Sequence, residues 1–396
     1  MEENIKTLLQ QIDALRKDLQ SLGPIEKAEQ RSKLRTTARQ LSLALEEPGD
    51  IVERVCYQFM ETVNIRIAIG LGLFKILTES ESPKTTLELA DMTKADPILL
   101  GRILRGLAAV GAVEDAGVES YTPTKVAQTF TRSSLAAAVE HNFDFLGPIW
   151  TSIPSWLAAN QYRNPDDMSD TAFHIGHGTK ENLSSFMARN PRYLDAYQRY
   201  MTSANEGRAS WMDFFPVQER LGKNAHKNQE AVFFVDIGGG MGHEASALHK
   251  RFPELPGRFV LQDLPEVVSQ VQAEGLEVIP HDFFNPQPVK GARVYYFRNV
   301  LHDWNDDAAV NILRLVRNAM DPNYSKILIN QWVVPVHGAT SFMTHQDLNM
   351  MAVFAGMERT EQQLRELLQR ADLQIEKIWS AGDDISEQLI ETVAII

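Results

Sequence analysis

The sequence is poor in cysteine, in long apolar runs and in positive charge, and each shortage excludes a class of protein. Cys56 is the only cysteine among 396 residues, which excludes an intramolecular disulfide and a thiolate zinc site and indicates an intracellular chain. No stretch approaches the roughly 20 apolar residues of a membrane span. The N-terminus is acidic and lacks the apolar core of a signal peptide. We therefore expect a cytoplasmic protein without a membrane partner.

The net charge of −13 makes long nucleic-acid polyanions unfavourable partners. Hydrophobic residues make up 44% of the chain and charged residues 23%, as in ordinary soluble globular proteins. A chain of this length is too long for one ordinary core, so we expect two domains with extensions.

Residues 1–22 carry apolar side chains spaced three and four apart, which places them on one face of a helix. Gly23 and Pro24 end this helix, and a second, highly charged helix is expected over 25–47. We assign residues 1–50 to a helical extension. Its apolar stripe packs either on its own domain or on a partner chain, and the sequence leaves both open. The stripe consists of Ile5, Leu8, Ile12, Leu15, Leu19 and Leu22.

Residues 51–135 have the pattern of a winged-helix domain. A helix pair comes first, a helix–turn–helix opens at Thr86, and two strands joined by a turn at Gly117 follow. A DNA-reading helix needs an excess of basic side chains, but residues 51–130 hold 8 Lys and Arg against 10 Asp and Glu. We therefore expect a structural domain that forms a homodimer and does not bind nucleic acid.

Residues 136–225 are predicted to be helical and are rich in aromatic side chains, asparagine and methionine. Such helices either wall an apolar pocket or form plain core, and periodicity does not separate the two. The segments 141–146 and 197–201 show the composition most clearly.

Strands and helices alternate over residues 226–396, which predicts an α/β fold with a doubly wound, Rossmann-like sheet. Ligands of such sheets bind at the carboxyl ends of the strands. The expected strands are 232–236, 257–263, 278–282, 293–297, 326–329 and 390–395.

The first of these strands runs into a glycine-rich loop, residues 238–242, and then into a helix. Glycines let the chain turn sharply and bring backbone N–H groups close to a ligand. Asp263 ends the second strand, 25 residues after Gly238, where its carboxylate can accept hydrogen bonds from both ribose hydroxyls. This arrangement fits the adenosine of either NAD or S-adenosylmethionine (SAM).

Two further features favour SAM. Asp282 ends the third strand, where it can accept from the adenine amino group, and Phe283 can pack on the adenine ring. The loop also lacks the GxGxxG spacing that a pyrophosphate prefers. The loop therefore suits the zwitterionic methionine end of SAM better than the two phosphates of NAD.

Five motifs in order make the sequence similar to a known family. They occupy residues 235–242, 261–265, 281–284, 301–304 and 356–360. The chain resembles the class I SAM-dependent O-methyltransferases of plant caffeate type, in particular the fungal members that act in secondary metabolism. The resemblance covers about residues 50–396. It implies a SAM-binding Rossmann-like domain, an N-terminal winged-helix dimerisation domain, a small-molecule acceptor with a hydroxyl group, and S-adenosylhomocysteine as the product.

The resemblance also implies roles for matching residues. His302 is the expected general base that takes the acceptor proton, and Glu358 is expected to orient that histidine. The implied cofactor-binding residues are Asp236, Gly238, Gly240, Asp263, Leu264, Asp282, Phe283 and Arg298. The implied residues of the acceptor pocket are His141, Asn142, Tyr197, Met201, Asn349 and Val353.

One position departs from the family pattern. The family carries Asp-Glu after the fifth strand, and here Asn330 and Gln331 stand in their place. Gln331 can accept a hydrogen bond from His302 but supplies no charge, so an imidazolium would be less stabilised. Three interpretations stay open. Glu358 alone suffices, or the acceptor is already acidic, or the chain resembles the pericyclases of this fold, which keep SAM without transferring its methyl group. No histidine or carboxylate spacing suggests a metal.

Overall fold

The computed structural model describes residues 2–21, 28–203, 206–269, 271, 274–382 and 386–395. It divides into two compact units. One unit holds Met1–Val55 with Gly382–Ile385, and the other holds Cys56–Ala381 with Ser386–Ile396. Leu22, Gly23 and Pro24 of the predicted first helix and its end lie outside the described residues.

The N-terminal unit is helical, as predicted. Its helices are α1 (Glu2–Ser21), α2 (Ala28–Ala44) and the start of α3 (Pro48–Gly70). The stripe residues of α1 whose side chains are described, Leu8, Ile12 and Leu15, are about half exposed. These apolar side chains are therefore not buried within the chain itself.

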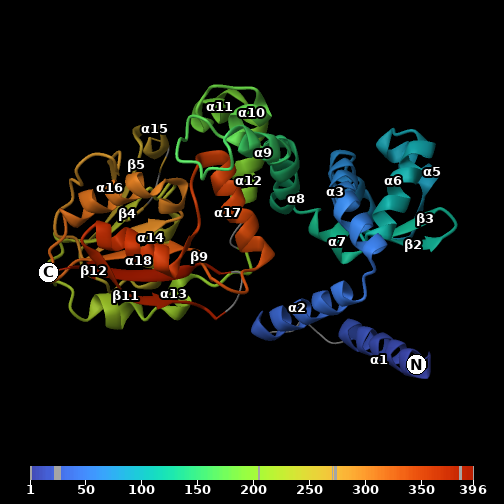
Figure 1. The fold of residues 1–396 in the computed structure, drawn as a ribbon, viewed down its shortest axis with the longest axis horizontal. Helices are drawn as coiled ribbons and strands as arrows, with labels where there is room; N and C mark the ends of the chain where they lie inside the picture. The colour runs from blue at the N-terminus through green and yellow to red at the C-terminus, as the bar shows by residue number, and fades with distance from the viewer. Residues whose placement is uncertain are drawn as a thin grey trace. The chain divides into compact units, whose positions relative to one another are not determined.

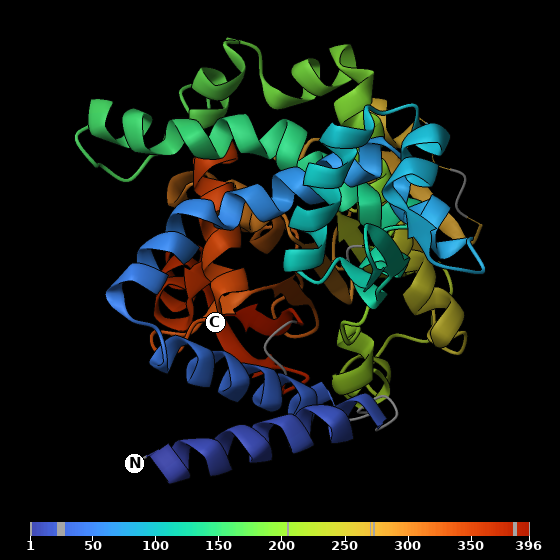
Figure 2. The same ribbon diagram turned by 90° about the vertical axis from the view of Figure 1, so that its right-hand side faces the viewer.

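The predicted helix–turn–helix and hairpin are present after α3. A capping box joins Thr85 to Glu88 at the start of α5, and Asp96 caps α6 just before Pro97. The three strands pair in the order β1-β3-β2, and these elements lie together in cyan in Figure 2. The elements are α4 (Leu73–Thr78), β1 (Lys84–Thr85), α5 (Thr86–Thr93), α6 (Pro97–Ala109), β2 (Val113–Gly117), β3 (Ser120–Pro123) and α7 (Lys125–Thr129).

The next segment is helical, as expected, and two of its turns, η1 and η2, are π-helical. Its first part shares a core with Val353 of a later helix, and this core is rich in phenylalanine. The elements are α8 (Ser133–Glu140), the π-helix η1 (His141–Leu146), α9 (Gly147–Ala159), α10 (Ala172–His177), α11 (Leu183–Arg189), α12 (Pro191–Met201), α13 (Trp211–Phe214) and η2 (Gln218–Gly222).

A seven-stranded sheet follows, in the order β11-β12-β8-β7-β4-β5-β6. The five strands from β8 to β6 are parallel, while β12 and β11 are antiparallel to their neighbours. The prediction of a Rossmann-like sheet is confirmed. The strand β11 was not predicted from the sequence. The strands are β4 (Val232–Ile237), β5 (Arg258–Asp263), β6 (Leu276–Pro280), β7 (Val294–Arg298), β8 (Lys326–Gln331), β11 (Leu373–Trp379) and β12 (Gln388–Ala394).

Helices cover both faces of this sheet (Figure 1). Apolar residues of α16 and α18 form the core against one face, and α13, η2 and α14 form the core against the other. The remaining elements are α14 (His243–Arg251), α15 (Pro265–Val268), η3 (Leu301–Asp303), α16 (Asp306–Arg317), β9 (Val333–Val334), α17 (Ser341–Phe354), β10 (Arg359–Thr360) and α18 (Glu361–Arg370).

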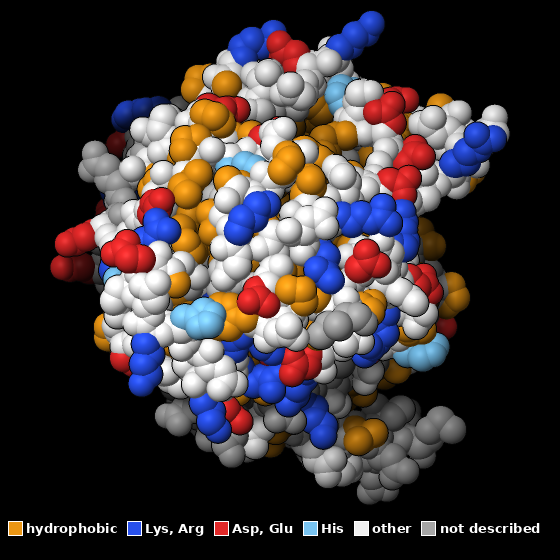
Figure 3. Space-filling view, turned by 90° about the vertical axis from the view of Figure 1, so that its left-hand side faces the viewer, with side chains coloured by type: hydrophobic (Ala, Val, Ile, Leu, Met, Phe, Trp, Pro, Cys, Tyr) orange, Lys and Arg blue, Asp and Glu red, His pale blue; other side chains and the backbone are white. Residues whose placement is uncertain are grey.

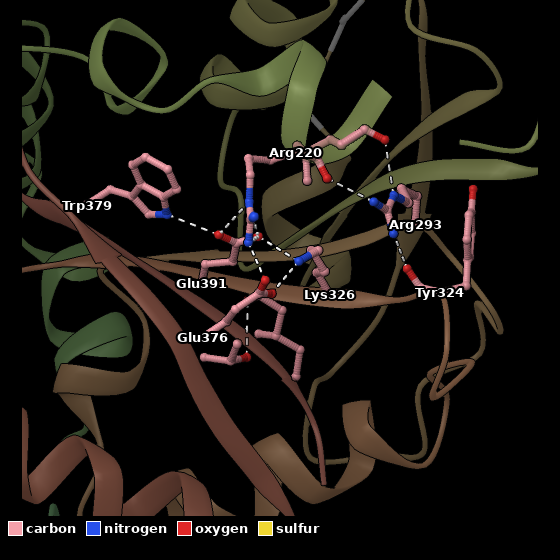
Figure 4. A network of polar contacts seen from close by, with 10 residues as sticks. Arg220, Arg293, Tyr324, Lys326, Glu376, Trp379 and Glu391 are labelled. Atoms are coloured by element: carbon pink, nitrogen blue, oxygen red, sulfur yellow. Dashed lines mark hydrogen bonds and ion pairs between the residues drawn. The ribbon is translucent and has the colours of Figure 1, made fainter. Parts of the chain in front are cut away.

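A polar network ties the antiparallel strands to β8 (Figure 4). Glu391 is fully buried and accepts from Arg220, from Lys326 at 2.7 Å and from Trp379 at 3.0 Å. Glu376 pairs with the same two cations. Because the buried carboxylate is satisfied by three donors, the antiparallel edge of the sheet is fixed to its parallel part.

The surface carries charges of both signs. On the face shown in Figure 3, basic and acidic side chains are intermingled and hydrophobic ones are scattered. That face therefore lacks the single-sign field that a polyanion would need. Within the described ranges, no helix combines the length and the apolar character that a membrane crossing requires.

Candidate active site

The glycine-rich loop leaves the end of β4 in a conformation that only glycine suits. Gly238 has a φ of 68°, and a Cβ there would lie 2.9 Å from Val300. At Gly239 a Cβ would lie 2.5 Å from the carboxyl carbon of Asp236 and 2.6 Å from Leu261. The backbone therefore approaches its neighbours closely here, which a loop that brings N–H groups to a ligand requires.

The acids predicted for the adenosine lie at adjoining strand ends. The two carboxyl oxygens of Asp263 accept from the Gly240 and Leu264 amides, each at 2.8 Å. The His281 amide donates to the Asp263 carbonyl at 2.9 Å, which brings Asp282 beside it. Phe283 lies next to Gly238. The predicted ribose and adenine residues are thus brought together around the loop, and each carboxylate keeps further acceptor capacity for a ligand.

Asp236 lies beneath this loop. Its side chain is 1% exposed and accepts from the Ala245 amide at 3.3 Å. Burial, together with nearby Glu244, raises the pKa of Asp236 to about 7. We therefore interpret Asp236 as a residue that shapes the loop from below, instead of the ligand contact that the resemblance implies.

Arg298 is the last residue of β7, and it lies between two carboxylates that were not predicted from the sequence. Its guanidinium pairs with Glu244 of α14 and with Glu387, which precedes β12, at 2.8 Å from Nε. These three residues, with Arg208 and Asn330, line a cavity of about 210 Å³. Charges of both signs in one small cavity at the glycine loop suit a zwitterionic group, such as the amino-acid end of SAM.

His302 lies in η3 and is held between two carboxylates. Its Nδ1 is 2.7 Å from Glu358, and its Nε2 is 3.5 Å from Asp303. Burial lowers the pKa of His302, but Asp303 and Glu358 raise it more, so that the pKa is about 9. Glu358 Oε1 accepts from Nδ1–H, which leaves Nε2 as the nitrogen able to take or hold a reacting proton.

Gln331 does not make the hydrogen bond that was expected with His302. It is fully buried, and neither its amide nitrogen nor its amide oxygen has a hydrogen-bond partner. Asn330 accepts from the Tyr296 hydroxyl at 2.9 Å and donates to the Gln388 carbonyl. Neither amide therefore offers His302 a charge or a hydrogen bond.

Aromatic rings lie near Asp303, the neighbour of this histidine. Tyr197 of α12 is 41% exposed, yet burial raises its pKa, and Asp303 raises it further. His141 of η1 lies 5.4 Å from the Tyr197 ring, and burial lowers the pKa of His141 to about 4. At neutral pH the imidazole of His141 is therefore neutral and that of His302 is protonated.

The π-helix that carries His141 is fixed on both sides. Phe143 stacks on Phe59 of α3 at 5.7 Å. Asp144 accepts two hydrogen bonds from Arg66, the shorter at 2.7 Å. His141 itself has no partner at Nδ1. Its neighbours are thus committed to the scaffold, and its own ring is buried against Phe145, Tyr197 and Tyr200. π-Helical turns of this kind are frequent at functional sites.

The other predicted pocket residues have different surroundings. Asn349 is nearly buried and accepts from Trp150 at 2.6 Å, while Val353 lies in the helical core. Asn142 donates to the Ala138 carbonyl at 2.7 Å, and Met201 is 39% exposed. These four residues have their contacts within the fold, so their role toward an acceptor stays a prediction.

Three acids at this site were not predicted. Asp303 precedes α16 but does not cap it, because Asn305 is the N-cap of that helix. Asp303 instead faces Tyr197 and His302, and burial raises its pKa to about 6. Glu244 and Glu387 carry no local signal, because only the sheet topology brings them to Arg298.

Among the described residues, no group of three His, Cys, Asp or Glu is arranged to hold a metal ion.

A Rossmann-like sheet with an adenosine-type loop, together with a buried histidine–carboxylate pair, is the architecture of a cofactor-binding enzyme. Comparison with known proteins narrows the class. A family model for an O-methyltransferase domain matches residues 220–374, and one for an O-methyltransferase dimerisation domain matches residues 53–133. The chain belongs to the O-methyltransferase family.

Similar proteins include both methyltransferases and a pericyclic enzyme. Methyltransferase cfoC of Aspergillus candidus is 40% identical over 404 residues, covering 100% of each chain. A solved structure described as a pericyclic reaction enzyme has a TM-score of 0.88 at 32% identity, over 98% of this chain and 100% of that one. LepI in complex with SAM has a TM-score of 0.87 at 31% identity, over 99% and 100%.

Proposed function

We propose that this chain is a SAM-dependent O-methyltransferase that acts on a hydroxyl of a small aromatic or polyketide-type compound, with His302 as the general base. The observation that carries the proposal is the pair of His302 Nδ1 and Glu358 at 2.7 Å, with the packed rings of Tyr197 and His141 as the nearest aromatic group named from the sequence. SAM, when bound, supplies the methyl group. The loop at Gly238 supports SAM binding, as does the similarity to LepI, whose structure was solved with SAM.

The chain's own residues account for the proton chemistry. A phenol has a pKa near 10 and is a weak nucleophile at neutral pH. Neutral His302 takes the hydroxyl proton at Nε2, and Glu358 holds the ring tautomer and stabilises the resulting imidazolium. The aromatic walls exclude water and hold the acceptor ring, so that its oxygen stays oriented.

Quaternary structure and location complete the proposal. We propose a homodimer formed through the N-terminal domain, which the match to a dimerisation domain over residues 53–133 supports. The exposed apolar side chains of α1 fit the same role. The single cysteine, Cys56, is consistent with a cytoplasmic setting.

The direct experiment uses SAM with a deuterated methyl group and a panel of phenols, hydroxy-pyridones and enols. Labelled product together with an equal amount of S-adenosylhomocysteine supports methyl transfer. Product formed without label, and equally well with S-adenosylhomocysteine, contradicts it.

A second function has its own observations. A SAM-bound pericyclase that does not transfer the methyl group is favoured by the unpartnered Gln331, which weakens the case for a strong base. His141 also supports it, because a neutral imidazole can donate a hydrogen bond to a polarised acceptor group. The similarity to a pericyclic reaction enzyme points the same way. In that case His141→Ala would reduce turnover far more than His302→Ala.

A further inference from the structure

Glu358 belongs to a short segment that joins α17 to β10 and packs against η3. The Met357 amide donates to the His302 carbonyl at 2.9 Å. Gly356 lies so close that a Cβ there would be 2.1 Å from the same carbonyl oxygen. Arg359 is fully buried and donates to two backbone carbonyls of the η3 region, at 2.8 and 2.7 Å. The segment is therefore fastened to the turn that carries the histidine.

Asp347 fastens the same segment to α17. The Glu358 amide donates to Asp347 Oδ1 at 2.8 Å, although the two residues are 11 positions apart. Glu358 is 4% exposed, so a backbone N–H that lost this acceptor would be buried and unsatisfied, which is unfavourable. The backbone of Glu358 itself is thus held by a side chain of the neighbouring helix.

The chain reverses sharply between these two residues. Ala355 has a φ of 55°, and the Gly356 amide donates to the Met350 carbonyl at 3.2 Å. The left-handed conformation is uncommon for alanine, so it persists only where the surrounding contacts hold it. The contact between Asp347 and the Glu358 amide closes this reversal.

Glu358 consequently makes two hydrogen bonds that lead from α17 to the imidazole. Its amide is bound to Asp347, and its Oε1 accepts from His302 Nδ1 at 2.7 Å. Its Oε2 has no hydrogen-bond partner. The direction of this carboxylate therefore depends on one side-chain bond and on the place of its own backbone. A displaced backbone would carry Oε1 away from Nδ1.

Asp347 can act here through its oxygen atom without its charge. His302 already has carboxylates on both ring nitrogens, Asp303 and Glu358. Burial raises the pKa of Asp347, and the hydrogen bond from the Glu358 amide opposes that rise. An uncharged oxygen at the same place would accept the same bond, so charge and hydrogen bond can be separated by substitution.

We propose that Asp347 is a positioning residue for the proposed methyl transfer, and that it fixes the backbone of Glu358 so that Oε1 meets His302 Nδ1. The inference rests on His302 as the proposed general base. α17 also carries Asn349 and Val353, which were predicted for the acceptor pocket. The helix that would contact the acceptor therefore also sets the histidine–carboxylate pair.

The test is the low-field proton NMR signal of the His302 Nδ1–H in the full chain bound to S-adenosylhomocysteine, assigned with His302→Asn. Asp347→Ala should move this signal upfield, because the bond to Glu358 lengthens. Misplacement of the pair should lower kcat roughly tenfold or more, while the KM for SAM stays within about twofold. An unchanged signal with an unchanged kcat would overturn the inference.

Further variants separate the hydrogen bond from charge and from general stability. Asp347→Asn keeps an oxygen acceptor and should restore the signal and most of kcat; equal losses in the Asn and Ala variants would refute the role. Asp321 also accepts from a backbone amide, that of Asn323 at 3.0 Å, in the turn before β8. Asp321→Ala should change neither readout. If Asp347→Ala does not fold, Asp347→Ser withdraws the acceptor, and a normal His302 signal in that variant also refutes the role.

The two readouts distinguish this inference from the proposed function. Absence of labelled product from the parent chain and from every variant would overturn the proposed methyl transfer. It would leave the NMR comparison intact, because that comparison needs only the folded, ligand-bound chain. Normal methyl transfer in Asp347→Ala, with an unmoved His302 signal, would overturn the role of Asp347 alone.

Discussion

His302 and Glu358 are 56 residues apart in the sequence and 2.7 Å apart in the structure. The contact depends on the backbone as well as on the side chains, because the Met357 amide donates to the His302 carbonyl at 2.9 Å. The segment after α17 is therefore fastened to η3, and the carboxylate reaches Nδ1 with its position already set. Preorganisation of this kind lowers the reorganisation that proton transfer would otherwise need.

Removal of the imidazole should abolish most of the methyl transfer. A positioned general base contributes roughly 10²–10⁴-fold to rate, so His302→Ala should reduce kcat by that factor. SAM affinity, measured by calorimetry, should stay within about twofold because the glycine loop is untouched. A slight loss of rate with normal affinity would show that another group takes the proton.

The rate should rise with pH into the alkaline range. The pKa of His302 is raised from 6.5 to about 9, so the imidazole is protonated at pH 7 and is free to act as a base only as pH passes 9. We expect kcat/KM to increase up to that point and then to level off. The same shift contributes stability that is present below pH 6.5 and lost as pH rises through 9. Urea unfolding at several pH values measures that loss.

Gly239→Ala should damage cofactor binding without unfolding the chain. Its Cβ would lie 2.5 Å from Asp236 and 2.6 Å from Leu261, so the loop must shift. We expect SAM affinity to fall at least about tenfold, or 1.4 kcal/mol. Gly49→Ala, where nothing lies within 4 Å of the new Cβ, is the matched control and should bind SAM normally.

Arg66 should affect the binding of the acceptor and not the binding of the cofactor. Its bidentate pair with Asp144 holds η1, which carries His141. Arg66→Gln should raise the acceptor KM roughly tenfold, or about 1.4 kcal/mol, with SAM affinity unchanged. Arg192 pairs with the same carboxylate, but its side chain is 69% exposed. Arg192→Gln should therefore have a much smaller effect, and equal effects would contradict the assignment.

The buried Glu391 should be important for stability alone. Its neutralisation leaves Arg220 and Lys326 with less compensation (Figure 4). Breaking a buried pair costs about 3 kcal/mol, and Glu391→Gln should lower the free energy of unfolding by about that amount. Glu277→Gln, at a pair with Arg258 that is 40% exposed or more, should cost less than about 1 kcal/mol.

The glycine loop and the parallel strands could be predicted because their signals are local. A buried apolar run followed by Gly238, and an acid at the next strand end, are visible in a few residues. β11 was not predicted, because it is an edge strand that alternates irregularly and carries Glu376 and Lys377 at its centre. Its place in the sheet comes from pairing with β12, which no local pattern records.

Only those site residues that belong to recognisable sequence motifs could be predicted. His302 and Glu358 were named from the sequence, and the structure brings them together. Glu244 and Glu387 could not be found in this way, because they meet at Arg298 only through the folding of α14 and β12 around the end of β7. These ion pairs between residues far apart in the sequence therefore form only in the folded sheet.

The π-helical turn at residues 141–146 also makes chain length a determinant of the pocket. A π-turn is an α-helix with one residue added, and each residue of an α-helix turns the chain by about 100°. Deletion of one residue from this segment would close the wide turn to a regular helix, with α8 and α9 kept in phase because the wide turn had absorbed the extra residue. The side chains of the turn itself, His141 among them, would then change direction although none had been substituted. Related chains that differ by one residue here would therefore present different pocket walls on the same scaffold.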